Sequence, residues 1–118
     1  MKRKSRIVRA PARHQPAALD IEAMRDNAGQ ASRLLRALSN ENRLMLLCLL
    51  FEGEKTVGEL NESLELSQSA LSQHLAVLRE EGMVNTRRAG QSIYYGLASP
   101  PAQRVIETLH SVYCPGRC

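Results

Sequence analysis

Three cysteines carry the most reactive side chains of this 118-residue sequence: Cys48, Cys114 and Cys118. Thiolates act as nucleophiles and bind soft metal ions, and two thiols can be joined by a sulfur bridge. Cys48 stands in the apolar run Leu44–Phe51, where a cysteine is also a common small buried residue. An odd number of cysteines argues against a structural disulfide framework. The residue types therefore leave reactive thiols, metal ligands and inert packing open.

A second set of polar side chains predicts binding to nucleic acid. The spacing of Leu71, Leu75 and Leu78 predicts a helix over residues 68–81 that packs through these leucines. The first turns of this helix carry, on the outer face, groups that can bond to base edges and phosphates. These groups are Gln68, Ser69, Ser72 and Gln73, with His74 beside them. Glutamine pairs with adenine in the major groove, and a helix N-terminus favours a phosphate, so duplex DNA is the expected partner. For His74, packing or a phosphate contact is favoured over base recognition.

The preceding residues predict a second short helix that positions the first. Thr56 and Glu59 have the spacing of a capping box, and Val57, Leu60 and Leu64 form an inward face after it. Ser67 has the side chain of an N-cap for the next helix. Two short helices separated by about three residues are typical of a helix-turn-helix.

A β-hairpin is expected after Gly82, where the apolar period changes from 3.6 to 2. Residues 83–88 and 92–97 are predicted strands, with a turn at residues 89–91. The hairpin tip carries Arg87, Arg88 and Gln91. Basic residues at such a tip suit a minor groove or a phosphate backbone. The few scattered aromatic residues argue against a base-stacking platform for single strands.

The first and last predicted helices each carry an apolar stripe that repeats every three or four residues. Such stripes need a partner surface, so we expect a dimer built from both helices. The expected interface residues are Ile21, Met24, Ala28, Leu35, Val105, Ile106 and Leu109. The helix over residues 41–52 is apolar all round from Leu44 onward and is expected to be the buried centre.

Charge divides the chain into a tail and one domain. The first 18 residues carry six basic and no acidic side chains, and the remainder has a net charge of −2. We expect residues 1–19 to form a basic, flexible tail attracted to a polyanion, and residues 20–118 to form the DNA-binding and dimerisation domain.

The longest apolar run has eight residues, too few to span a membrane, and the chain lacks a secretory signal, so a cytoplasmic protein is expected. It also lacks the residue sets of an enzyme.

Several ungapped segments in this order resemble the ArsR family of repressors. They are Leu-Ser-Asn-Glu-Asn-Arg-Leu (38–44), Val-Gly-Glu-Leu (57–60), Leu-Ser-Gln-Ser-Ala-Leu-Ser-Gln-His-Leu (66–75) and Leu-Arg-Glu-Glu-Gly-Met-Val (78–84). The resemblance covers about residues 20–115. It implies a mainly helical fold with a small β-hairpin, the homodimeric winged helix-turn-helix. It also implies a repressor that leaves operator DNA when an inducer binds. The DNA contacts that the resemblance implies are, on the recognition helix, Ser67, Gln68, Ser69, Ser72, Gln73 and His74, and on the wing, Arg87, Arg88 and Gln91.

The resemblance also bears on the inducer. The Cys-x-Cys of the family's metal sensors corresponds to residues 57–60, which hold no cysteine, and of their ligands on the last helix only Glu107 and His110 are present. No metal site is therefore expected. Cys48 and Cys114 instead resemble the pair of the SqrR/BigR-type persulfide sensors, whose thiols become bridged by a short polysulfide. This branch implies reactive sulfur species as inducers. His110, one turn before Cys114, would favour its thiolate if protonated.

Four alternatives stay open. The three cysteines together would suit arsenite or a soft metal ion. Cys114-Pro115 is a dipeptide seen in haem-regulated proteins, although no cofactor is expected. A plain disulfide would make the chain a general redox-responsive repressor. A protein-interaction module without DNA binding is disfavoured by the basic tail and the arginines of the wing.

Overall fold

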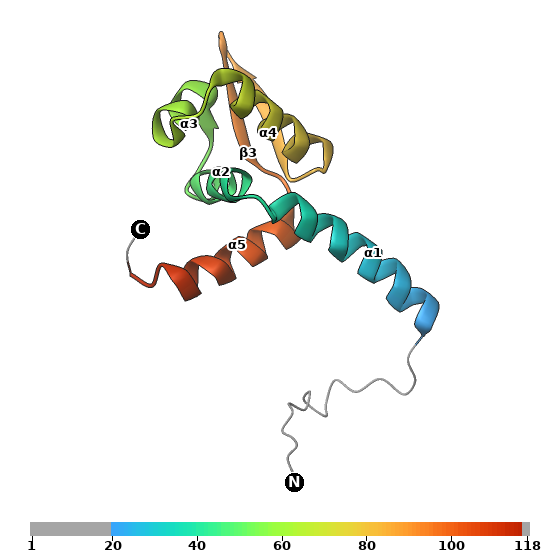
Figure 1. The fold of residues 1–118 in the computed structure, drawn as a ribbon. Coiled ribbons are helices and arrows are strands. Elements are labelled where there is room, and N and C mark those ends of the chain that lie inside the picture. The colour runs from blue at the N-terminus through green and yellow to red at the C-terminus, as the bar shows by residue number, and fades with distance from the viewer. Residues whose placement is uncertain (1–19, 117–118) are drawn as a thin grey trace. The chain divides into compact units, whose positions relative to one another are not determined.

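The computed structural model describes residues 20–116, which form five helices and three strands (Figure 1). The elements are α1 (Ile21–Leu38), α2 (Glu41–Phe51), β1 (Lys55–Thr56), α3 (Val57–Leu64), α4 (Gln68–Glu80), β2 (Val84–Ala89), β3 (Ser92–Leu97) and α5 (Pro100–Tyr113). The contacts divide the chain after Gln30, within α1, and the residues from Ala31 onward form one compact unit. The expected basic tail and Cys118 lie outside the described residues.

Side-chain caps fix the junction between α1 and α2. The Asn40 side-chain oxygen accepts hydrogen bonds from the backbone N–H groups of Asn42 and Arg43, at 2.9 and 3.1 Å. The Arg43 Nε donates to the carbonyl oxygen of Ala37 at 2.7 Å and so satisfies the end of α1. Because both helix ends are satisfied by their neighbours, the chain turns here within two residues.

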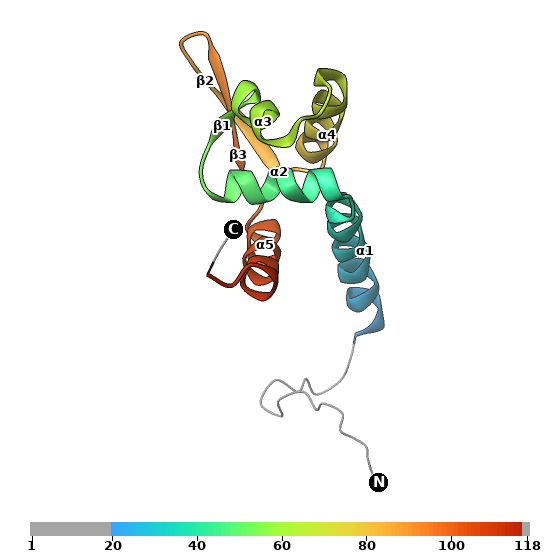
Figure 2. The same ribbon diagram turned by 60° about the vertical axis from the view of Figure 1, so that its left-hand side comes forward.

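Helix α2 lies at the centre of the compact unit. Figures 1 and 2 show α3 and α4 on one side of α2 and α5 on the other. Six large side chains are completely buried in the shared core: Leu46, Leu47, Leu60, Leu71, Leu78 and Ile106. Helix α2 is thus the central element, as expected, but it is not buried all round, because Met45 is 51% exposed.

The sheet has three antiparallel strands in the order β1-β3-β2, not the two of the expected hairpin. The two-residue β1 pairs with β3, so that Lys55 is opposite Tyr95 and Thr56 is opposite Tyr94. Strands β2 and β3 form the hairpin, which extends past α3 in Figure 2. Gly90 takes a positive φ of 64° at its turn, as expected. Within residues 20–116, no helix is long and apolar enough to cross a membrane.

Candidate functional site

Helix α3 and the turn after it set the position of α4. The expected capping box is present: the Glu59 N–H donates to Thr56 Oγ1 at 3.2 Å, and the Thr56 N–H donates to Glu59 Oε1 at 2.8 Å. Glu65 ends α3 in the left-handed conformation, with φ of 56°. Ser67 then caps α4, because its Oγ accepts from the Ala70 N–H at 3.1 Å. The helix-turn-helix is thus held by its own side chains.

The two faces of α4 differ as the sequence predicts. Leu71, Leu75 and Leu78 are buried against the core. The exposed polar side chains on its first turns are Gln68, Ser69, Ser72 and Gln73. His74 is half-buried beside them. Helix α4 therefore presents a strip of neutral hydrogen-bonding groups of the kind that contacts base edges.

The wing places basic groups beyond this strip. Arg88 is opposite Ile93 and Ala89 is opposite Ser92, so the turn falls at residues 90–91. Arg88 and Gln91 are exposed at the tip. Because successive side chains of a strand point to opposite faces, Arg87 and Arg88 lie on different faces of the sheet. The sequence predicted these arginines at the tip but not their different surroundings.

Arg87 is engaged within the wing by two residues that the sequence analysis did not single out. Its Nε donates to Glu54 Oε1 at 2.8 Å, and its guanidinium carbon lies 4.8 Å from the centre of the Tyr94 ring. Glu54 is 33 residues away along the chain, so no local pattern indicates the pair. Tyr94 is opposite Arg87 in the β2–β3 register, a contact that the hairpin alignment could have supplied.

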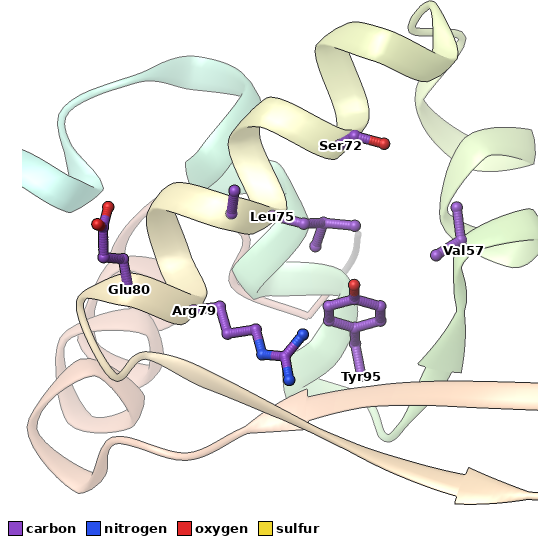
Figure 3. Close-up of a pocket in the computed structure, with 7 residues that line it drawn as sticks. Val57, Ser72, Leu75, Arg79, Glu80 and Tyr95 are labelled. Carbon is purple, nitrogen blue, oxygen red and sulfur yellow. The ribbon is translucent and has the colours of Figure 1, made fainter.

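A groove of about 470 Å³ runs between α4 and the sheet (Figure 3). Its lining residues are Val57, Ser72, Leu75, Ala76, Arg79, Glu80 and Tyr95. In Figure 3 the Arg79 side chain extends toward Tyr95, while the Tyr95 hydroxyl points into the space between Leu75 and Val57. The groove thus has an apolar floor with polar groups at its edges, next to the exposed face of α4.

Cys48 lies half-buried on α2 and is a free thiol. It packs against the apolar core, and burial raises the pKa of its thiol from the ordinary value of 9.0. Little thiolate is therefore present at neutral pH without an activating partner.

Cys114 follows the last residue of α5, and its N–H donates to the carbonyl oxygen of His110 at 2.8 Å. Cys114 is disulfide-bonded, and because Cys48 is free, that bond is not to Cys48. The Phe51 and His110 rings pack with their centres 6.2 Å apart. Phe51 is one turn after Cys48 and His110 is one turn before Cys114, so the helix segments that carry the two cysteines are neighbours.

Among residues 20–116, no three His, Cys, Asp or Glu side chains are grouped so that they could hold a metal ion. The three-cysteine alternative includes Cys118, which lies outside this range.

The apolar stripes expected at a dimer interface are partly exposed. On α1, Ile21, Met24 and Leu35 are 56%, 47% and 57% exposed. On α5, Val105 and Leu109 are half-buried. Ile106 is completely buried within its own chain, because α5 packs that face into the core below α2, so it has no surface to offer a second subunit. The exposed apolar end of α5 consists instead of Val112 and Tyr113.

The profile of the bacterial regulatory protein arsR family matches residues 40–86. The chain is 50% identical over 98 residues to the transcriptional activator HlyU of Vibrio cholerae serotype O1, covering 83% of this chain and 91% of HlyU. It is 45% identical over 96 residues to the biofilm growth-associated repressor of Agrobacterium fabrum, covering 81% of this chain and 82% of that protein.

Solved structures agree with this similarity. Reduced HlyU from V. cholerae superposes with a TM-score of 0.76 at 52% identity, over 79% of this chain and 98% of that one. The transcriptional repressor BigR from Xylella fastidiosa superposes with a TM-score of 0.72 at 42% identity, over 81% of this chain and 98% of BigR. The homodimeric winged helix-turn-helix domain of Mb0332 from Mycobacterium bovis superposes with a TM-score of 0.67 at 29% sequence identity. This match covers 81% of this chain and 87% of that one.

Proposed function

Since the chain belongs to the ArsR family of DNA-binding transcriptional regulators, which are not enzymes, we propose that it is a homodimeric repressor that releases operator DNA when reactive sulfur species link Cys48 to Cys114. The observation that carries the sensing part is the contact of Phe51 with His110, which brings the cysteine-bearing segments of α2 and α5 together.

Operator binding is assigned to α4 and the wing. The exposed outer face of α4 suits the major groove, and Arg87, Arg88 and Gln91 suit the adjacent backbone or minor groove. The hydroxyl of Ser67 already caps α4. A backbone amide of the first turn of α4 then remains available to a phosphate.

Dimerisation is assigned to the exposed apolar residues of α1 and α5. Several large apolar side chains that are about half exposed along a helix mark a surface suited to a protein partner. The homodimeric Mb0332 domain supports a second copy of this chain as that partner. The proposed interface keeps Ile21, Met24, Ala28, Leu35, Val105 and Leu109 and adds Val112 and Tyr113.

The sign of regulation is proposed as repression. The two groups of relatives carry opposite names, activator for HlyU and repressor for BigR. Repression is favoured by the repressor names of the relatives from Agrobacterium fabrum and Xylella fastidiosa, and it requires only that the protein occupy an operator. Loss of DNA binding would then be the inducing event.

The sensing chemistry starts from the reduced protein, with thiols at both cysteines. Each thiolate attacks the outer sulfur of an organic persulfide RSSH, so that an S–S bond forms on the protein and RSH leaves. Joining the two resulting cysteine persulfides releases two protons and two electrons. A third RSSH accepts them and gives RSH and H₂S. The product is a tetrasulfide between Cys48 and Cys114 that contains two added sulfur atoms.

Cys114 is expected to react before Cys48. Burial raises the pKa of the Cys48 thiol, whereas a protonated His110 one turn away would favour the thiolate of Cys114. The substitution His110→Ala should therefore slow the labelling of Cys114 in the reduced protein by a thiol reagent. An unchanged labelling rate would remove His110 from the mechanism.

Intact-protein mass spectrometry tests the sulfur proposal. Reduced protein is exposed separately to an organic persulfide, hydrogen peroxide and glutathione disulfide, and the crosslinked peptides are mapped. The expected result is a link between Cys48 and Cys114 with persulfide alone, heavier by two sulfur atoms and lighter by two hydrogens. A plain disulfide with peroxide would identify a general redox switch, and no link with any reagent would refute thiol sensing.

A further inference from the structure

One face of the wing's sheet brings together residues from β2 and β3 and the residue before β1. Tyr94 and Gly96 are two apart on β3 and therefore share a face. The register places Arg87 opposite Tyr94 and Asn85 opposite Gly96. Because Lys55 is opposite Tyr95, Glu54 reaches the level of Gly96 on the other side of β3.

Gly96 leaves the space that Glu54 occupies. A Cβ atom added to Gly96 would lie 3.2 Å from Glu54 Cγ and 3.6 Å from Glu54 Oε2. A side chain at this buried position would make Glu54 shift by a few tenths of an ångström. The glycine and β1 together direct the Glu54 carboxylate along the sheet toward Arg87.

The contacts of Arg87 leave one edge of its guanidinium for another partner. Glu54 uses the Nε–H, and the guanidinium carbon lies over the Tyr94 ring. The two terminal nitrogens make no hydrogen bond or ion pair to the residues that the structure describes, and the side chain is 55% exposed. Two parallel N–H groups at such an edge match two oxygens of a phosphate.

We infer that Glu54 and Tyr94 are positioning residues that hold the wing arginine ready for a backbone phosphate of duplex DNA. This inference rests on the proposed DNA contact of the wing. An unrestrained arginine loses rotamer freedom when it binds a phosphate, and a restrained one has already lost it. The Glu54 carboxylate has an opposing effect, since its negative charge repels the phosphate.

Two neutral variants separate the hydrogen bond from the charge. Glu54→Gln keeps an oxygen that accepts from Arg87 Nε, whereas Glu54→Ala does not, and both lose the same charge. Each is made in the wild-type chain and in the Arg87→Ala chain. The probe is a fluorescent duplex recovered from a randomised pool with the wild-type protein, and affinity is measured over a series of salt concentrations.

The expected result is that Glu54→Ala binds about threefold to tenfold more weakly than Glu54→Gln, with an unchanged salt slope. In the Arg87→Ala chain the two variants should bind equally. Arg87→Ala alone should weaken binding and reduce the salt slope by about 0.9, the value for one phosphate. Thermal unfolding of each variant checks that the fold is unchanged.

Other outcomes overturn different parts of the account. If Arg87→Ala weakens binding but the two Glu54 variants bind equally, the positioning role fails and the wing contact stands. If their difference persists without Arg87, Glu54 acts through the fold and the inference fails. If Arg87→Ala leaves affinity and salt slope unchanged, the proposed contact of Arg87 with DNA is itself refuted. Tighter binding of Glu54→Ala than of Glu54→Gln would show that Glu54 holds Arg87 away from DNA.

Discussion

Leu71 and Ser72 are neighbours on α4 that should respond oppositely to the same substitution, alanine. Leu71 is completely buried in the core, and removing a buried leucine side chain costs about 2 to 5 kcal/mol. A domain of this size is stable by about 5 to 15 kcal/mol, so Leu71→Ala should remove a large fraction of the stability. Ser72 is exposed, and its replacement should change the free energy of unfolding by about 0.5 kcal/mol or less.

The effect of Ser72→Ala should appear in DNA affinity instead of stability. If Ser72 donates a hydrogen bond to DNA, its loss costs about 0.5 to 1.5 kcal/mol, which is roughly a twofold to twelvefold rise in Kd. Stability is measured by urea denaturation at one protomer concentration, because dimerisation makes the midpoint depend on concentration. Affinity is measured by fluorescence anisotropy with the selected duplex.

The assignment of the two faces of α4 fails under either of two results. The first is that Leu71→Ala lowers the free energy of unfolding by less than about 1 kcal/mol, which would mean that α4 does not pack as described. The second is that Ser72→Ala lowers the free energy of unfolding by more than about 1 kcal/mol, which would give Ser72 a structural role. Unchanged DNA affinity of Ser72→Ala would remove this residue from the proposed contacts.

Three further results are expected. Thr56→Ala removes the hydroxyl of the capping box and should lower the free energy of unfolding by about 1 kcal/mol, measured by urea denaturation, whereas no change would make the box incidental. In the Cys114→Ser, Cys118→Ser double variant, alkylation of Cys48 should be slow at pH 8 and still accelerate as the pH rises past 9.0, because burial raises the pKa of this thiol and delays formation of its thiolate; a plateau below pH 9.0 would contradict that shift. Leu35→Lys places a charge at an exposed apolar position of α1 and should shift sedimentation from dimer toward monomer, and an unchanged dimer would exclude Leu35 from the interface.

Local sequence signals predicted most of the fold because they act within one or two helix turns. The capping box of Thr56 and Glu59, the Ser67 cap and the leucine spacing of α4 each depend on residues three or four apart. Strand β1 was missed because two residues carry no detectable period. Its existence depends on pairing with β3, which lies about 40 residues further along the chain.

The candidate site was predictable only where it follows from helix faces. The outer face of α4 is the complement of its buried leucines, so Gln68, Ser69, Ser72 and Gln73 could be placed on it. The Glu54–Arg87 pair depends on tertiary contacts that no spacing encodes. Ile106 was assigned to the dimer because an apolar stripe does not distinguish the core of a chain from the surface of its partner.

The central claim is that a bridge between Cys48 and Cys114 controls DNA binding. Its most direct measurement is the anisotropy of the labelled duplex bound to reduced protein while an organic persulfide is added without oxygen. The account predicts that the wild-type protein releases the duplex and that Cys48→Ser stays bound under the same conditions. Release from Cys48→Ser, or continued binding by a wild-type protein whose bridge is verified by mass, would contradict it.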